Sequence, residues 1–116
     1  MALVGIISGV FLITIAPTDY TSLEPLAKYD SYKFKEFVSE MKEEHRGALG
    51  NKIYAVEGKV EAILEFGFTL GGGVVCTTAD STDLGFSLGD KVSVKGRFIS
   101  YDDLFEEIRL DYVVPL

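Results

Sequence analysis

The sequence contains few of the residues from which catalytic and metal sites are usually built. It has one cysteine, Cys76, and one histidine, His45, among 116 residues. A lone cysteine excludes a disulfide within the chain, and Cys76 has no histidine or carboxylate at a catalytic spacing. A histidine where a helix is expected to end is usually a favourable charge at the helix terminus. We therefore predict no catalytic residue, no metal site and no cofactor, and we do not expect an enzyme.

Positive charge is absent from a long stretch of the chain. No Lys or Arg lies between Lys59 and Lys91, and the formal net charge is −7. The affinity of proteins for nucleic acids depends largely on Lys and Arg side chains that neutralise phosphates. The composition therefore disfavours a polyanionic partner, and a local basic patch is the arrangement that would still permit one.

The first sixteen residues, MALVGIISGVFLITIA, carry no charge. As a helix they would reach about 24 Å against a hydrocarbon core of about 30 Å, a length typical of the apolar region of a signal peptide. No basic residue precedes them, and Pro17 directly follows the small residue Ala16. We predict that residues 1–17 are a membrane anchor or an uncleaved signal, which would place the remaining domain on the extracytoplasmic side. The alternative is a buried strand, because many of these residues are β-branched.

A linker and a helix are expected next. Prolines and several Ser and Thr residues follow the apolar run, which predicts a linker over residues 18–29. A helix is expected over Asp30–Arg46, because Asp30 or Ser31 can cap it and apolar residues recur at helical spacing. That apolar stripe consists of Phe34, Phe37, Val38 and Met41. Residues 30–116 are predicted to form the folded domain.

The stretch Lys52–Leu64 has the alternation of a half-buried strand. Its inward row is Tyr54, Val56, Gly58, Val60 and Ala62, and charged residues dominate the other row. Gly58 removes one side chain from the inward row, which usually allows a strand to bend sharply or another backbone to approach closely. A long, bent strand of this kind commonly pairs with two neighbours and so closes a barrel.

Four further strands and a connector are expected after this one. Phe66–Leu70 and Val74–Thr78 form a hairpin, in which three glycines permit positive φ angles in the turn. Strands are also expected at Lys91–Tyr101 and Phe105–Val114, and Thr78–Gly89 is a polar connector with one short helical turn under the barrel. Asp80 and Asp83 lack the glycine and terminal glutamate of a calcium loop. The predicted core is Val56, Val60, Val92, Val94, Phe98, Ile108 and Leu110, with Phe37 and Met41 at the end of the barrel.

This order of elements resembles the OB-fold, and most closely the small tRNA-anticodon-like OB-fold family of bacterial and archaeal proteins. The matching residues are Val56–Val60, Phe68, Val75–Cys76 and Leu88–Gly96. The resemblance covers Asp30 to the end of the chain, and its motifs are specific through their order and spacing rather than singly. It implies an all-β, five-stranded Greek-key barrel preceded by one amphipathic helix. It also implies frequent membrane tethering and a nucleic-acid-binding label that rests on fold.

A candidate ligand face follows from this resemblance. An OB barrel binds extended strands across its second and third strands, with basic residues for the backbone and aromatic residues for stacking. The candidate residues are Lys59, Phe66, Phe68, Lys95 and Arg97. Phe66 and Phe68 are two residues apart and would lie on the same face of a strand, and we expect both side chains to point into the barrel. Lys95 and Arg97 are expected to lie beside acidic residues of the neighbouring strands, namely Glu57, Glu61, Glu107 and Asp111.

These observations favour a non-enzymatic binding or adaptor module, tethered to a membrane and contacting a protein or another envelope component. Weak or absent nucleic-acid binding is expected. One alternative is a single-stranded nucleic-acid-binding OB domain, as the family label implies. A second alternative is a domain similar to the OB-fold haem chaperones, which is disfavoured because the chain has no histidine after His45.

Overall fold

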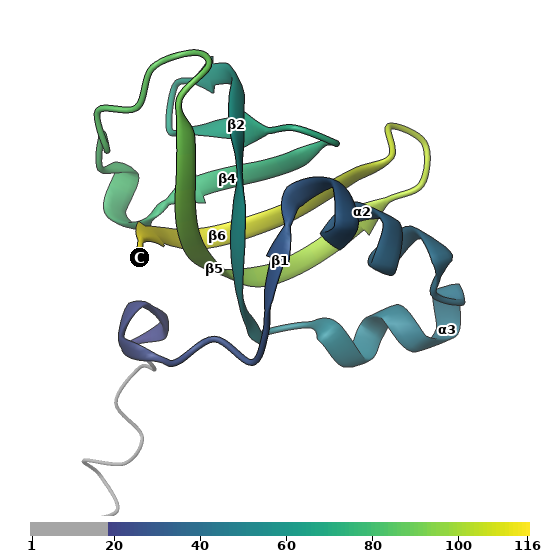
Figure 1. Cartoon of the computed structure of the whole chain (residues 1–116). Coiled ribbons are helices and arrows are strands. Elements are labelled where there is room, and N and C mark those ends of the chain that lie inside the picture. Colours follow the sequence, from purple (N-terminus) through teal and green to yellow (C-terminus); the bar gives the residue numbers. More distant parts are fainter. Residues whose placement is uncertain (1–18) are drawn as a thin grey trace, which may run out of the picture.

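The computed structural model describes residues 19–116, so the predicted anchor, residues 1–17, lies outside the described residues. Five strands close into a β-barrel (Figure 1). Their order around the barrel is β2, β3, β4, β6 and β5, and a further pairing of β5 with β2 completes the circle. All neighbours are antiparallel except β4 and β6, which are parallel. The strands are β2 (Ile53–Leu64), β3 (Gly67–Leu70), β4 (Val74–Thr78), β5 (Lys91–Asp102) and β6 (Glu107–Pro115).

The long strand β2 pairs along both of its edges, as its length and its central glycine predicted. Residues 53–59 pair with β5, and residues 60–64 pair with β3. A short parallel strand, β1 (Lys28–Asp30), lies on the edge of β2 that β5 leaves free. The register between β2 and β3 shifts between Val60 and Ala62, where β2 bends across the barrel.

Part of the segment expected to be a linker is paired with the barrel. The strand β1 begins at Lys28, and the Leu26 amide donates to the Ile53 carbonyl at 2.8 Å. The Ala55 amide donates in turn to the Ala27 carbonyl at 2.9 Å. A turn of 3₁₀ helix, η1 (Tyr20–Ser22), precedes these contacts. The residues from Tyr20 onward therefore pack with the barrel instead of only leading to it.

Two short helices, rather than one, occupy the range of the expected helix. They are α2 (Ser31–Glu40) and α3 (Glu43–Arg46), separated by extended backbone at Met41 and Lys42. The Asp30 carboxylate accepts the Tyr32 amide at 2.9 Å, which confirms the predicted N-terminal cap. A second 3₁₀ turn, η2 (Gly47–Leu49), leads into β2.

The side chains of α2 that close the end of the barrel differ from those predicted. Phe34 and Val38 are fully buried, whereas Phe37 is 37% exposed and stacks on Tyr29 with ring centroids 5.3 Å apart. The break after Glu40 removes Met41 from the helix, although Met41 still packs against the edge of the core. The prediction of Phe37 and Met41 as the plug is therefore wrong, because the i, i+4 pair three positions earlier, Phe34 and Val38, faces inward.

The predicted core is confirmed at six of seven positions. Val92 is only half-buried, and the others lie fully within the core. The buried set is Val56, Val60, Val94, Phe98, Ile108 and Leu110. Cys76 is also buried on β4, in agreement with its expected role as a small core residue.

The last strand departs from strict alternation at Tyr112. This residue has a φ of +50° and is exposed, whereas Val113 is fully buried. The registers of β6 with β4 and with β5 both shift near this point. Two consecutive residues, Asp111 and Tyr112, therefore lie outside the barrel, which is the signature of a β-bulge. Strict alternation from Ile108 and Leu110 would place Tyr112 inside the barrel, and the bulge instead turns it outward.

Two glycine positions allow α2 to approach the barrel. The N-terminal residue of α2, Ser31, lies over Gly58, and a Cβ at position 58 would lie 2.9 Å from the Ser31 Cβ. Tyr32 covers the glycine turn between β3 and β4, where a Cβ at Gly71 would lie 2.7 Å from the tyrosine hydroxyl. The turn also uses positive φ angles, +88° at Gly72 and +90° at Gly73, as predicted. Close approach and turn conformation thus both require glycine here.

We expect Gly58→Ala to lower the free energy of unfolding by about 1–3 kcal/mol, because the added Cβ overpacks the contact with Ser31. Gly47→Ala is the matched control, since a Cβ there meets nothing within 4 Å. Its backbone is helical, so alanine should cost nothing or stabilise slightly. Denaturant unfolding of both variants measures the difference, and equal stability of the two would contradict a tight contact between α2 and β2.

Candidate functional site

The structure does not bring the five candidate ligand residues together. Phe68 is buried in the barrel, whereas Phe66 lies in the turn between β2 and β3 with 52% of its surface exposed. In the register of β2 with β5, Lys59 lies opposite Lys91, and Arg97 lies opposite Ile53. Lys59 and Ile53 are six residues apart along β2. At about 3.3 Å per residue, these two points on the barrel are about 20 Å apart. The expectation of an inward-pointing row holds for Phe68 but not for Phe66.

Arg97 is held in a cluster that joins the N-terminal segment to the barrel. Its Nε donates to Asp111 Oδ1 at 2.7 Å, and its terminal nitrogens donate to Asp111 Oδ2 and Asn51 Oδ1. The guanidinium lies 4.5 Å from the ring centroid of Tyr20 and 5.0 Å from that of Tyr112. The hydrogen bonds to Asp111 raise the pKa of Arg97. This arginine is thus committed to internal contacts, and its predicted pairing with Asp111 is confirmed.

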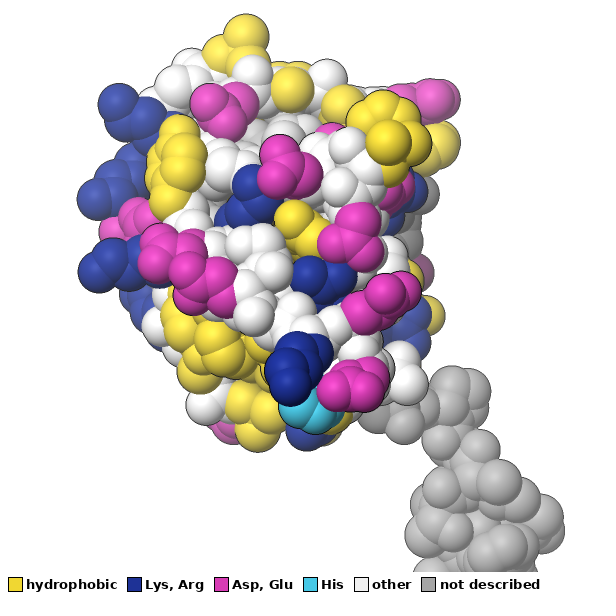
Figure 2. Space-filling model, turned by 90° about the vertical axis from the view of Figure 1, so that its right-hand side faces the viewer, with side chains coloured by type: hydrophobic (Ala, Val, Ile, Leu, Met, Phe, Trp, Pro, Cys, Tyr) yellow, Lys and Arg dark blue, Asp and Glu magenta, His cyan; other side chains and the backbone are white. Residues whose placement is uncertain are grey.

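Other cations of the barrel also have partners. The Glu57 carboxylate forms salt bridges with Lys91 and Lys28, with oxygen to Nζ distances of 3.2 and 3.6 Å. The hydrogen bond from Lys91 lowers the pKa of this carboxyl. Lys95 was expected beside carboxylates, but in the strand register it lies opposite Ala55 of β2. Its ammonium donates a hydrogen bond to the Leu23 carbonyl at 2.9 Å. Figure 2 shows the mixture of charges on one face, where basic and acidic side chains lie next to one another. No broad basic track results on that face.

The outer face of β3 and β4 carries no charge. Its outward side chains are Thr69, Val75 and Thr77. Around this face, the interval between Lys59 and Lys91 contains acidic residues and no basic ones. The acidic residues are Glu61, Glu65, Asp80, Asp83 and Asp90. A nucleic-acid backbone laid across these strands would therefore meet no compensating cation from this interval.

The two sides of the barrel are covered differently. The helix α2 covers one side, and the segment between β4 and β5 runs over the opposite side (Figure 1). That segment begins with one helical turn, the 3₁₀ turn η3 (Ala79–Ser81), and continues without helix through residues 82–90. Positive φ angles at Gly85 and Gly89 interrupt any helical run.

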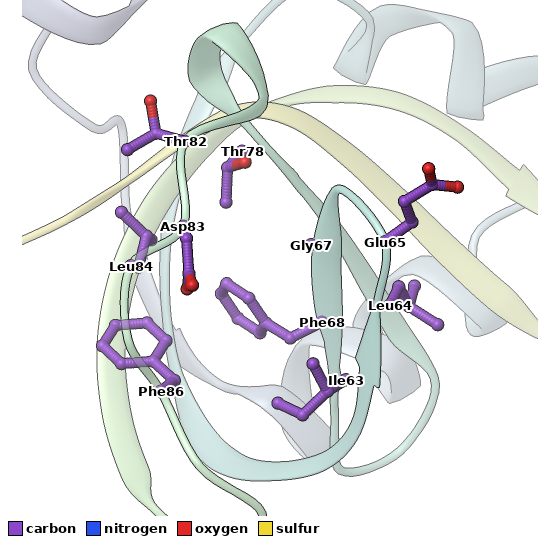
Figure 3. Close-up of a pocket in the computed structure, with 10 residues that line it drawn as sticks. All are labelled: Ile63, Leu64, Glu65, Gly67, Phe68, Thr78, Thr82, Asp83, Leu84 and Phe86. Atoms are coloured by element: carbon purple, nitrogen blue, oxygen red, sulfur yellow. The ribbon is translucent and has the colours of Figure 1, made fainter.

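A pocket of about 130 Å³ remains under this connector (Figure 3). Phe86 of the connector meets Phe68 of β3 edge to face, with ring centroids 5.2 Å apart. Leu84 is half-buried beside them and packs against the core. The residues that line the pocket are Ile63, Leu64, Glu65, Gly67, Phe68, Thr78, Thr82, Asp83, Leu84 and Phe86.

Apolar side chains at the end of β2 and in the turn that follows it are accessible near this pocket. Ile63 and Leu64 at the end of β2 and Phe66 in the following turn are all exposed. We call these three residues, together with Leu84 and Phe86 of the connector, the hairpin patch. A contiguous group of exposed apolar side chains is typical of an interaction surface. The hairpin patch with its pocket is therefore the best candidate site on the described part of the molecule.

The described residues offer no catalytic alternative to this surface. Burial raises the pKa of the Cys76 thiol, so it has little nucleophilic character. His45 lies in the exposed last turn of α3, 3.9 Å from Glu44. Within residues 19–116, no three side chains of His, Cys, Asp or Glu come together to hold a metal ion. Over the same range, the helices are all too short or too polar to cross a membrane.

Comparison of the chain with protein-family models, curated proteins and solved structures found no match. The function is therefore inferred from the geometry and chemistry of the site itself. A fold alone does not define an activity, whereas exposed groups and their charges restrict the class of partner.

We expect the protein to bind single-stranded DNA or RNA weakly or not at all at about 0.15 M salt, because few phosphates would be neutralised. Stacking adds about 1–3 kcal/mol per base only where an aromatic ring is exposed. Fluorescence anisotropy with labelled oligonucleotides measures this. Salt-sensitive binding in the micromolar range or tighter would contradict the prediction, and Lys59, Lys95 and Arg97 would then be the first residues to replace.

Proposed function

We propose that the barrel is an OB-fold module that binds a protein partner through the hairpin patch and has no enzymatic activity. The strand order supports the OB assignment. The fourth strand of the barrel, β5, lies between the first, β2, and the fifth, β6, and the third and fifth strands are parallel. This is the arrangement of an OB-fold Greek-key barrel. In OB-folds the loop between the first two strands flanks the ligand-binding face, and here that loop carries Phe66.

The observation that carries the proposal is the exposure of the hairpin patch beside a pocket that reaches the core. Burying exposed aliphatic and aromatic side chains stabilises a complex by roughly 25 cal/mol per Å² of apolar surface. Aromatic residues at the centre of an interface commonly contribute most of the binding free energy. Phe66 is the exposed aromatic residue at the tip of the β2–β3 hairpin.

The charges around the patch favour a protein over a nucleic acid. Glu65 and Asp83 line the pocket, and no Lys or Arg occurs from residue 60 to residue 90. Acidic side chains repel phosphates and attract partners that carry basic residues, which also speeds association. A protein segment with both apolar and basic side chains complements this surface.

Attachment to a membrane through residues 1–16 completes the proposed role. Its support is the uncharged composition of that segment. Such an anchor would hold the binding module near envelope components and raise the effective concentration of a membrane-bound partner. The module would then act as a tethered adaptor.

Phe66→Ser tests the hairpin patch, with Phe105→Ser as the matched control. Phe66 is 52% exposed and Phe105 is 66% exposed, and each lies at a hairpin tip, so neither replacement should unfold the barrel. The tagged intact chain is purified by affinity from its own cells together with its bound proteins. We expect the unchanged chain to recover at least one protein whose recovery falls about tenfold with the Phe66→Ser variant. The control should retain it. Equal recovery with both variants would contradict the patch, and loss only with Phe105→Ser would place the contact at the β5–β6 turn.

Ile7→Arg tests the membrane anchor, with Ile7→Leu as the control. An arginine at the centre of a membrane-inserted segment costs about 2.5–3.5 kcal/mol. We expect the unchanged chain and the leucine variant to sediment with membranes at about 1 M salt, where surface charge attraction is screened. The arginine variant should move to the supernatant. Recovery of the unchanged chain in the supernatant would contradict the anchor.

A further inference from the structure

The pocket in the hairpin patch has the size of one side chain. Its volume is about 130 Å³, close to that of an apolar cavity of about 150 Å³ that binds a single benzene. The ring of Phe68 forms its floor, and Phe86 and Leu84 form one wall (Figure 3). Ile63 stands beside the Phe68 ring on the hairpin side, whereas the Leu64 side chain points away from the two rings. A small pocket lined by both apolar and polar side chains fits one side chain presented by an extended peptide.

One carboxylate is directed into this pocket. Figure 3 shows the Asp83 carboxylate turned toward the rings of Phe68 and Phe86, whereas the Glu65 carboxylate points away. The Gly85 amide donates to Asp83 Oδ1 at 2.8 Å, which fixes the orientation of the side chain. Within residues 19–116, no basic side chain forms a salt bridge with Asp83. Its second oxygen is therefore free to accept from a group in the pocket.

We propose that this pocket takes one cationic side chain, lysine or arginine, from a peptide segment of a protein partner. The inference rests on the proposed function and specifies the partner's chemistry. The aliphatic stem of the cation would pack against Phe68 and Phe86, and its charged head would pair with Asp83. A cation near an aromatic face gains a further attraction to the ring. Long basic side chains commonly bury their stems in this way and keep the head in polar surroundings.

Other occupants fit the pocket less well. An acidic side chain would meet the Asp83 carboxylate, and a like-charge contact is unfavourable. A purely apolar side chain would remove water from Asp83 without supplying a donor, which costs free energy. A free polyamine or amino acid would leave the exposed Ile63 beside the pocket uncovered. The flanking residues of a peptide can cover it.

Two synthetic peptides test the proposal against the intact, ¹⁵N-labelled protein in a mild detergent. They are acetyl-Leu-Lys-Leu-amide and the same peptide with norleucine, which has a similar stem and no charge, in place of lysine. In NMR titrations we expect saturable shifts of the Phe68 and Gly85 amides. The lysine peptide should bind about threefold to fivefold more tightly, the upper part of the range expected of a partly exposed ion pair.

Two variants, Asp83→Asn and its control Asp80→Asn, test whether the charge of Asp83 causes the preference for lysine. The asparagine oxygen at position 83 can still accept from Gly85, so the loop should keep its conformation while it loses the charge. Asp80 lies in the same connector, is exposed and does not line the pocket. We expect Asp83→Asn to abolish the preference for lysine over norleucine, and Asp80→Asn to retain it.

Three results would overturn the proposal. They are equal binding of the two peptides to the unchanged protein, a lysine preference that survives Asp83→Asn, and the absence of saturable shifts with either peptide. None of these results changes the outcome expected of the affinity purification with Phe66→Ser and Phe105→Ser, which tests the hairpin patch independently. Failure of the pocket and failure of the hairpin patch are therefore distinguishable.

Discussion

The barrel depends on hydrogen bonding along both edges of β2. One edge belongs to β5, and along the other edge β1 and β3 follow one another, where Ala55 bonds to Ala27 and Lys59 bonds to Gly71. The chain leaves β1 for α2 at the junction of these two strands, directly over Gly58. A side chain at that position would push α2 outward, together with the residues that close the barrel. The absence of a Cβ at one position thus connects strand pairing to the closure of the core.

The candidate site follows from the unequal covering of the barrel. On one side, α2 contributes Phe34 and Val38, which are both fully buried. On the other side, positive φ angles at Gly85 and Gly89 keep the connector irregular. Leu84 and Phe86 cover Phe68 only in part, and a pocket remains. The same irregular backbone turns Asp83 toward the pocket, so one local feature supplies both the space and its charge.

Within residues 19–116, ion pairs hold several charged side chains elsewhere on the surface but none at this site. Several of the basic side chains are paired with carboxylates of the barrel and its loops, as Arg97 is with Asp111 and Lys91 is with Glu57. Arg97 also lies against Tyr20, which fastens the segment before β1 to the bulge of β6. Asp83 has no such partner among the described residues, and unlike other unpaired carboxylates such as Glu61 and Asp90 it lines the pocket. An interaction with a basic partner at the pocket would therefore replace solvent rather than an existing ion pair.

The sequence by itself determined the features that depend on near neighbours in the chain. Alternation placed Val56, Val94 and Ile108 inside, the glycine run specified the β3–β4 turn, and Asp30 capped α2. These follow from backbone geometry and side-chain period, which act over a few residues. Only the tertiary structure decided that Phe34 rather than Phe37 faces the core, that Tyr112 lies on a bulge, and that Phe66 is exposed while Phe68 is buried. It alone brought Asp83 to the Phe68 ring. Such features depend on which distant segments meet and in what register, and no local periodicity contains that information.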